Sequence, residues 1–156
     1  MPRSPRPTAS PALEVPALEI HQGPNRRLYL FGVDGKRLPE FAAISRVHRD
    51  DDSQVHGYQR PEVIAHIAEI RRYLESEDPL VPNALVVAFD ERVTFTPTSP
   101  SKASNGYAVP GTLSIPLDPT LPDEAKPGWI VDGQQRTAAI RDSSLDAFPV
   151  SVVGFI

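Results

Sequence analysis

Residues 132–136 bring together, in one short segment, the groups that bind an anionic ligand. Gly133 lets the backbone turn sharply and lets a ligand come close. Gln134 and Gln135 both donate and accept hydrogen bonds, and Arg136 carries a planar fork of donors that suits phosphate oxygens. If a helix begins here, its first N–H groups point outward and favour an anion. The segment therefore predicts a site for a nucleotide phosphate.

Two roles are open for Asp132. Its carboxylate either caps the helix that follows or, with a divalent ion bound, holds that ion or its water shell. Asp-Gly is also a common turn pair, so Asp132 and Gly133 alone are compatible with a plain structural turn. A turn does not require two glutamines and an arginine in the next helical turn, and this favours a ligand site.

The flanking residues predict a strand before this segment and a helix after it. Trp129 to Val131 is apolar and partly β-branched, as expected of a buried strand end. The residues that follow are good helix formers with apolar side chains at Ala139 and Ile140, and they predict a helix over residues 133–142. The polar segment thus lies at a strand-to-helix junction.

A second helix is predicted over residues 61–76, with Pro61 suited to its first turn. Its apolar residues recur at intervals of four, three and four and form one stripe: Val63, Ile67, Ile70 and Leu74. The polar residues that mostly lie off the stripe are explained by a plain amphipathic helix: His66, Glu69, Arg71 and Arg72.

The segment Asp132-Gly133-Gln134-Gln135-Arg136 resembles the signature of the DGQHR/DGQQR-domain family. That family includes DndB-like proteins of DNA phosphorothioation systems, relatives in deazaguanine DNA-modification clusters, and the nucleotide-hydrolysing domain of GmrSD-type restriction enzymes. A second match lies at residues 57–61, Gly-Tyr-Gln-Arg-Pro, followed by a helix and the apolar strand 84–89. The resemblance covers about residues 55–156. Gln135 stands where many members have His, so an imidazole is absent at that position, and the glutamine form is typical of the restriction-type branch.

The resemblance implies a ParB/sulfiredoxin-like fold whose motif loop binds a nucleoside triphosphate with Mg²⁺. It implies catalytic roles for Asp132, Gln135 and Arg136, and no separate protein metal site. The residues implied to contact the nucleotide are Gly133, Gln134, Arg136, Thr137 and Arg60. Arg60 lies at the entrance of the 61–76 helix, from which it reaches the signature; the alternative is a surface ion pair with Glu62, which contributes little to stability.

These elements define an α/β (α+β-like) domain over residues 13–156, after a proline-rich, disordered tail at 1–12. It has a small mixed sheet, with the signature at a sheet edge facing the helix after Arg60. The expected strands are 13–20 and 28–33, which pair or neighbour one another, then 84–89, 111–117 and 148–156. The expected helices lie near 36–46, 61–76 and 133–142, and residues 96–111 are expected to form a mobile loop.

Composition sets limits on the class of protein. The chain has no cysteine, no apolar run long enough to span a membrane and no apolar secretory signal, which favours a soluble, cytoplasmic protein. A net charge of -4 argues against a uniformly basic domain that coats nucleic acid. Four cations form either a local basic face or an ordinary solvated surface: Arg26, Arg27, Lys36 and Arg37. His48 and His56 flank three aspartates, 50–52, but their spacing does not fit a metal site.

The chain ends on an apolar stretch, residues 150–156, and the proteins it resembles continue further. A strand there would leave an unpaired edge and an apolar face. We therefore expect a truncated domain that self-associates or is marginally stable.

Two functional classes remain open. In the first, the domain binds and hydrolyses a nucleoside triphosphate for a DNA-modification or anti-phage defence system, with Arg136 and Arg60 neutralising phosphate charge. In the second, it is a non-catalytic, DndB-like regulator that binds DNA at the promoter of a DNA-modification operon. Other DNA-modification proteins are expected partners in either case. A nuclease is disfavoured because no cluster of carboxylates and lysine typical of metal nucleases occurs.

Overall fold

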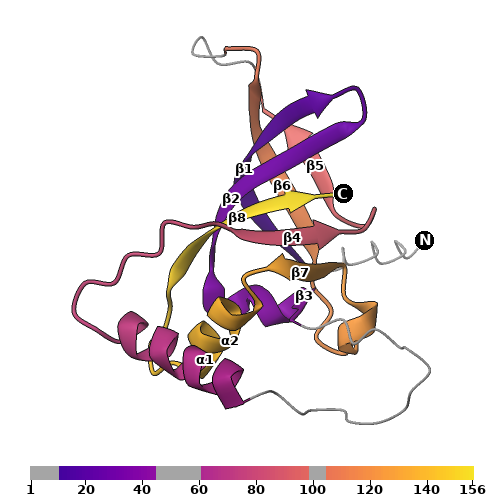
Figure 1. Cartoon of the computed structure of the whole chain (residues 1–156). Helices are drawn as coiled ribbons and strands as arrows, with labels where there is room; N and C mark the ends of the chain where they lie inside the picture. The colour runs from indigo at the N-terminus through magenta and orange to yellow at the C-terminus, as the bar shows by residue number, and fades with distance from the viewer. Residues whose placement is uncertain (1–10, 45–60, 99–104) are drawn as a thin grey trace, which may run out of the picture.

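The structure, a computed structural model, describes residues 11–44, 61–98 and 105–156. Eight strands form one mixed sheet in the order β3-β7-β4-β8-β2-β1-β6-β5. The sheet curls strongly, and the helices gather at one end of it (Figure 1). The strands are β1 (Ala12–Gly23), β2 (Arg26–Asp34), β3 (Ala42–Ala43), β4 (Leu85–Phe89), β5 (Thr94–Pro97), β6 (Ala108–Pro116), β7 (Gly128–Asp132) and β8 (Pro149–Phe155). The helices are α1 (Pro61–Leu74), α2 (Gln134–Asp142) and the short 3₁₀ helices η1 (Gly35–Glu40) and η2 (Asp123–Ala125). The α/β class is confirmed.

Side chains that alternate along the strands explain how the curled sheet encloses a core. Val15 and Ala17 of β1 point inward together with Phe31 of β2 and Val152 of β8, and all four are buried. β1 pairs antiparallel with β2, with Ala17 opposite Phe31, so the expected pairing of these segments is confirmed. Ala12 already belongs to β1, and residues 1–10 of the expected tail lie outside the described residues.

β8 lies inside the sheet and has a strand on each side. It pairs antiparallel with β2 and parallel with β4, and Val150 and Val152 alternate into the core. The expectation of an unpaired edge at residues 150–156 is therefore wrong. A terminal apolar strand need not leave an edge, because pairing depends on strands far away in the sequence, here β2 and β4.

The helix expected near residues 36–46 is also wrong in type and length. A 3₁₀ helix, η1, spans Gly35–Glu40, with the Asp34 carboxylate accepting from the Lys36 amide at its start. Pro39 lacks the N–H that a longer α-helix would use. The helix ends at Glu40, with Phe41 as its C-cap, and β3 then pairs in parallel with β7. Leu38 and Phe41 are fully buried, so these two apolar side chains anchor a tight turn in the core and do not form the stripe of a longer helix. Residues 45–46 lie outside the described residues.

The segment expected to be a loop, residues 96–111, is partly strand. β5 pairs antiparallel with β6, with Thr96 opposite Thr112 and Pro97 opposite Gly111. β5 is an edge strand, and edge strands tolerate proline and need no hydrophobic alternation. The serines and prolines of this segment therefore predicted a loop where a strand forms. Residues 99–104, at the middle of the segment, lie outside the described residues.

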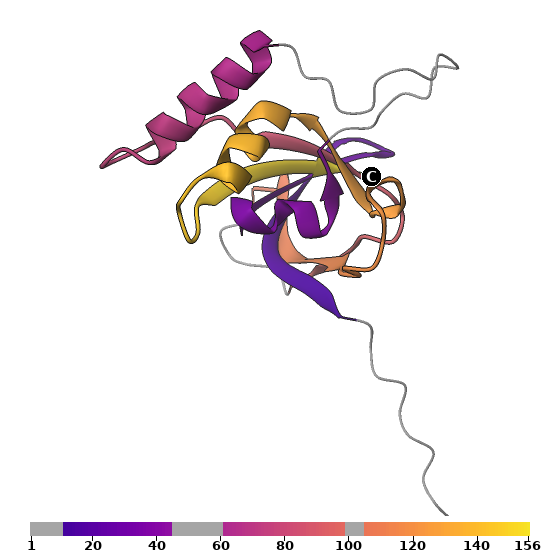
Figure 2. The same cartoon turned by 90° about the horizontal axis from the view of Figure 1, so that it is seen from below.

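The helix α1 lies against α2 on the outside of the molecule, away from most of the sheet (Figure 2). Three residues of its predicted apolar stripe face the core, since Leu74 is buried and Ile67 and Ile70 pack against it, while Val63 in the first turn is half-buried. The Glu75 carboxylate, just beyond the helix, accepts a 2.9 Å hydrogen bond from the Ser144 amide, after α2. The signature helix thus faces α1, as expected. None of the helices in the described ranges is long and apolar enough to cross a membrane.

Candidate ligand-binding groove

The signature begins at an irregular strand end. β7 pairs antiparallel with β4, where Val86 lies opposite Asp132 and Val87 lies opposite Ile130. Val131 is therefore an extra residue on β7, a bulge that bends the strand. Both Val131 and Asp132 are exposed. The bulge places the carboxylate of the signature, that of Asp132, outside the core, at the start of the turn into α2.

Gly133 is required at the turn for two reasons. It has a φ of +95°, a left-handed conformation that side chains disfavour, and a Cβ added there would collide with the Leu85 side chain. Its carbonyl accepts hydrogen bonds from both the amide and the hydroxyl of Thr137, each at 2.9 Å. Thr137 is fully buried, so it fastens the turn from inside and does not line the groove.

Asp132 does not cap α2. The N-cap position is Gly133, and no side chain accepts a capping hydrogen bond there. Asp132 is still the last residue of β7, one position too early to cap. Its carboxylate is 71% exposed and lies 3.7 Å from the Arg136 guanidinium. Of the two roles left open for Asp132, capping is therefore wrong, and the first N–H groups of α2 receive no acceptor from the N-cap side chain.

Arg136 is partly a structural residue. Its Nη1 donates to the Asn83 carbonyl at 2.6 Å and its Nη2 donates to the Ala84 carbonyl at 3.4 Å. The side chain is 22% exposed. Arg136 thus clamps the segment that enters β4 onto the signature turn, and it is also one of the residues that line the groove. The sequence does not indicate this clamp, because both acceptors are backbone atoms far away in the chain.

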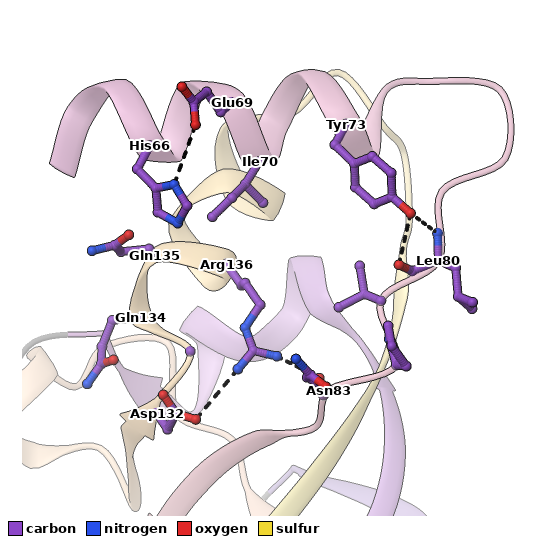
Figure 3. A pocket seen from close by; sticks show the side chains of 13 residues that line it. His66, Glu69, Ile70, Tyr73, Leu80, Asn83, Asp132, Gln134, Gln135 and Arg136 are labelled. Atoms are coloured by element: carbon purple, nitrogen blue, oxygen red, sulfur yellow. Dashed lines mark hydrogen bonds and ion pairs between the residues drawn. The ribbon is translucent and has the colours of Figure 1, made fainter. Parts of the chain in front are cut away.

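The two glutamines of the signature are used differently. The Gln134 side chain folds back onto β7, where its Nε2 donates to the Val131 carbonyl at 2.9 Å and to the Ile130 carbonyl at 3.2 Å. Gln135 lies on the side of α2 that faces α1, and its side chain extends into the space between the two helices (Figure 3). Of the two amides, Gln135 is the one positioned to meet a ligand.

A groove of about 640 Å³ runs between α1 and the signature turn. One wall is polar and consists of Asp132, Gly133, Gln134, Gln135 and Arg136. The facing wall is largely apolar and consists of Ile70, Tyr73, Leu80, Val81 and Pro82. His66, Glu69 and Asn83 complete the lining (Figure 3). Figure 3 shows Gln134, Gln135 and His66 at one end of this space and Tyr73 and Leu80 at the other, so the groove has a polar end and an apolar end.

Tyr73 holds the apolar wall in place. Its hydroxyl donates to the Leu80 carbonyl at 3.0 Å and accepts from the Leu80 amide at 2.9 Å. Tyr73 is 49% exposed and Leu80 is 73% exposed, so a large part of this wall faces solvent. The sequence analysis missed this wall, because Tyr73 lies beside the apolar stripe of α1 and the segment after α1 has no regular pattern.

Several predicted residues lie elsewhere or cannot be placed. Arg60 lies outside the described residues, as do His48, His56 and residues 50–52. Within the described ranges, no three His, Asp or Glu side chains gather as a metal ion would require.

The four cations considered as a basic face do not form one cluster. Arg26 and Arg27 open β2, whereas Lys36 and Arg37 follow its other end. The Lys36 ammonium donates to the Ser143 carbonyl at 2.6 Å, and Arg37 pairs with Glu40 at 2.9 Å. These two contacts give the second pair of cations local partners.

The structure is that of a mixed α/β protein with a groove at a strand-to-helix turn. The family described as DndB, DNA-sulfur modification-associated, matches residues 15–156, which include the whole turn and both walls. The chain therefore belongs to the DndB family and is a DNA-modification-associated protein. No curated protein and no solved structure matches the chain.

Proposed function

We propose that the groove binds a nucleotide, with its phosphates at the signature turn, and that this binding serves a DNA-modification system. The observation that carries the proposal is that one groove has both a polar wall and an apolar wall. A polar turn faces an apolar wall that includes Tyr73, and a nucleotide has the same two halves. The volume, about 640 Å³, is in the range of small-molecule sites.

The polar wall suits a phosphate group. No side chain among the described residues caps α2, so the amides of its first turn can meet an anion, and the positive end of the helix dipole adds to the attraction. Gln135 and Arg136 line the same space. Arg136 contributes charge as well as donors, and its clamp on Asn83 holds the fork in place.

The apolar wall suits the base. The ring of Tyr73 is held through its hydroxyl, so packing a planar base against it costs little side-chain entropy. Val81 and Pro82 extend this surface. Base packing of this kind tolerates many bases, so we expect the groove to select for phosphate more strongly than for base identity.

Mg²⁺ and hydrolysis are a further part of the proposal. Mg²⁺ commonly binds through one or two carboxylates together with substrate phosphates, and Asp132 supplies one exposed carboxylate beside the turn. Gln135 would orient the phosphate end or a water molecule near it. The order of strand, signature and helix also supports kinship with ParB/sulfiredoxin-like domains. A role in phage defence is one setting in which such an activity would serve.

The test is a titration of the full chain with labelled nucleoside triphosphates, with and without Mg²⁺. Gln135→Ala should weaken binding without loss of stability. Arg136→Ala should weaken it by about 1–3 kcal/mol, the range of a charge-assisted hydrogen bond, and should also lower stability through the lost clamp. Arg92→Ala, which removes an arginine that pairs with Asp90 outside the groove, is the control. Equal affinities for the parent and both groove variants would refute the proposal. Tight binding of duplex DNA by a chain that binds no nucleotide would favour the regulator class.

A further inference from the structure

His66 and Glu69 form a pair on the face of α1 that looks across the groove at the signature turn. The His66 Nδ1 lies 3.6 Å from the Glu69 carboxylate, one helical turn further along. Both side chains line the groove, and both are more than half exposed, at 56% and 67%. A solvated helix face does not by itself explain why this pair borders the polar end, next to Gln135 (Figure 3).

The orientation of the ring decides what it can contact. With Nδ1 turned to Glu69, the other nitrogen, Nε2, lies on the side of the ring nearer Gln135, as Figure 3 shows. A carboxylate beside Nδ1 favours an N–H on that nitrogen, so Nε2 carries an N–H of its own only in the protonated ring, the imidazolium. Glu69 therefore positions His66, and His66 is free to meet a group held between the two helices.

We propose that His66, as an imidazolium, donates a hydrogen bond from Nε2 to the anionic end of the ligand, while its Nδ1–H faces Glu69, which orients the ring. The inference rests on the proposed nucleotide function and deepens it, because it assigns one ligand contact to α1. The ligand then bridges the two helices: α2 supplies backbone amides, Gln135 and Arg136, and α1 supplies an imidazolium. The charged groups facing this position are Glu69, Asp132 and Arg136.

The consequence for selectivity follows from where His66 lies. It borders the polar end of the groove, while Tyr73 lies near the apolar end, about two helical turns further along α1. His66 should therefore act on the phosphates and not on the base. Inorganic triphosphate, which has no base, should depend on His66 as strongly as a nucleoside triphosphate does.

The experiment measures binding of a fluorescent nucleoside triphosphate to the full chain, and its displacement by inorganic triphosphate. His66→Ala should weaken both about tenfold, the effect expected for one hydrogen bond to a charged group. His66→Gln, which places an amide donor near the position of Nε2, should restore part of the affinity. Glu69→Gln should weaken binding less than His66→Ala. Arg72→Ala is the matched control, because Arg72 is exposed on the same helix, does not line the groove and carries a positive charge.

The outcomes separate this inference from the function on which it rests. If the parent binds neither probe, both are refuted. If the parent binds, Gln135→Ala weakens binding and His66→Ala does not, the nucleotide site stands and the role of His66 is refuted. A loss confined to the nucleotide, with inorganic triphosphate unaffected, would also refute it, because His66 would then contact the base or sugar.

Discussion

Two polar clusters in this molecule differ in whether their groups find partners inside the protein. On the inner face of the β1–β2 hairpin, Glu19 lies opposite Tyr29, and His21 lies opposite Arg27. The buried Glu19 carboxylate is 2.6 Å from His21 and 3.6 Å from Arg27. Burial, followed by the hydrogen bond to Glu19, raises the pKa of the Tyr29 phenol. The four side chains satisfy one another.

The groove shows the opposite arrangement. Asp132 is 71% exposed and its ion pair with Arg136 is 3.7 Å long. Within the part of the chain that the structure describes, no side chain caps α2, and Gln135 extends toward α1. Polar groups that a fold uses for its own stability are normally paired within it, as Glu19 is. Polar groups left exposed around an open volume are the arrangement expected of a ligand site. The comparison predicts that changes at the hairpin cluster affect stability, whereas changes at the groove surface affect binding.

The largest expected loss of stability is at Gly133, which lies in the groove wall but is also required by the fold. Gly133→Ala should cost roughly 2–4 kcal/mol of unfolding free energy, from left-handed strain plus a collision with Leu85. Gly106 is the matched control, because its φ is also positive, +79°, and an added Cβ there meets nothing within 4 Å. Gly106→Ala should cost about 1–2 kcal/mol from the strain alone. Urea unfolding measures both. Equal losses at the two glycines would show that the contact with Leu85 does not matter.

The hairpin cluster provides the second prediction. Glu19→Ala leaves Tyr29, His21 and Arg27 without their shared acceptor and should cost about 1–3 kcal/mol. It should also bring the pKa of Tyr29 down toward its ordinary value, because the carboxylate no longer disfavours the phenolate. Unfolding and a spectroscopic phenolate titration measure the two effects. Nucleotide affinity should not change.

Glu14→Ala is the control for that experiment, since Glu14 is exposed on the same strand and its loss should change stability by less than about 0.5 kcal/mol. If Glu19→Ala is no more destabilising than Glu14→Ala, the hairpin cluster does not stabilise the fold, and it then does not differ from the groove in its contribution to stability.

The sequence predicted what depends on local patterns and missed what depends on distant partners. The stripe of α1 and the turn at Gly133 follow from helical spacing and from glycine's freedom, and both are where the sequence placed them. β5 has no alternation of its own and exists because β6 lies beside it. The clamp from Arg136 to Asn83 joins residues 53 positions apart through a backbone acceptor, which no residue type signals.

The failed cap at Asp132 has a similar cause. Asp before a glycine and a helix is a common capping pattern, but β7 continues to Asp132 because Val86 of β4 pairs with it. The bulge at Val131 and the collision that Leu85 would make with any larger residue fix the turn one position later. Pairing with β4 therefore decides which residue is the N-cap of α2, and it leaves the Asp132 carboxylate in the lining of the groove.

The smallest expected effect on stability, and the sharpest test of the groove, is Asp132→Asn. The pair with Arg136 is long and exposed, so unfolding free energy should change by less than about 1 kcal/mol. In a chelator, nucleotide affinity should rise severalfold, because a negative charge beside the phosphates is removed. In Mg²⁺, affinity and any turnover should fall, because the ion loses its carboxylate. Asp132→Asn should thus bind nucleotide more tightly than the parent in a chelator and less tightly than the parent in Mg²⁺. Asp123→Asn, a similarly exposed carboxylate that pairs with Lys126, should show no reversal. If Asp132→Asn binds nucleotide more tightly both with and without Mg²⁺, Asp132 does not serve a metal ion, and its carboxylate only opposes the anion.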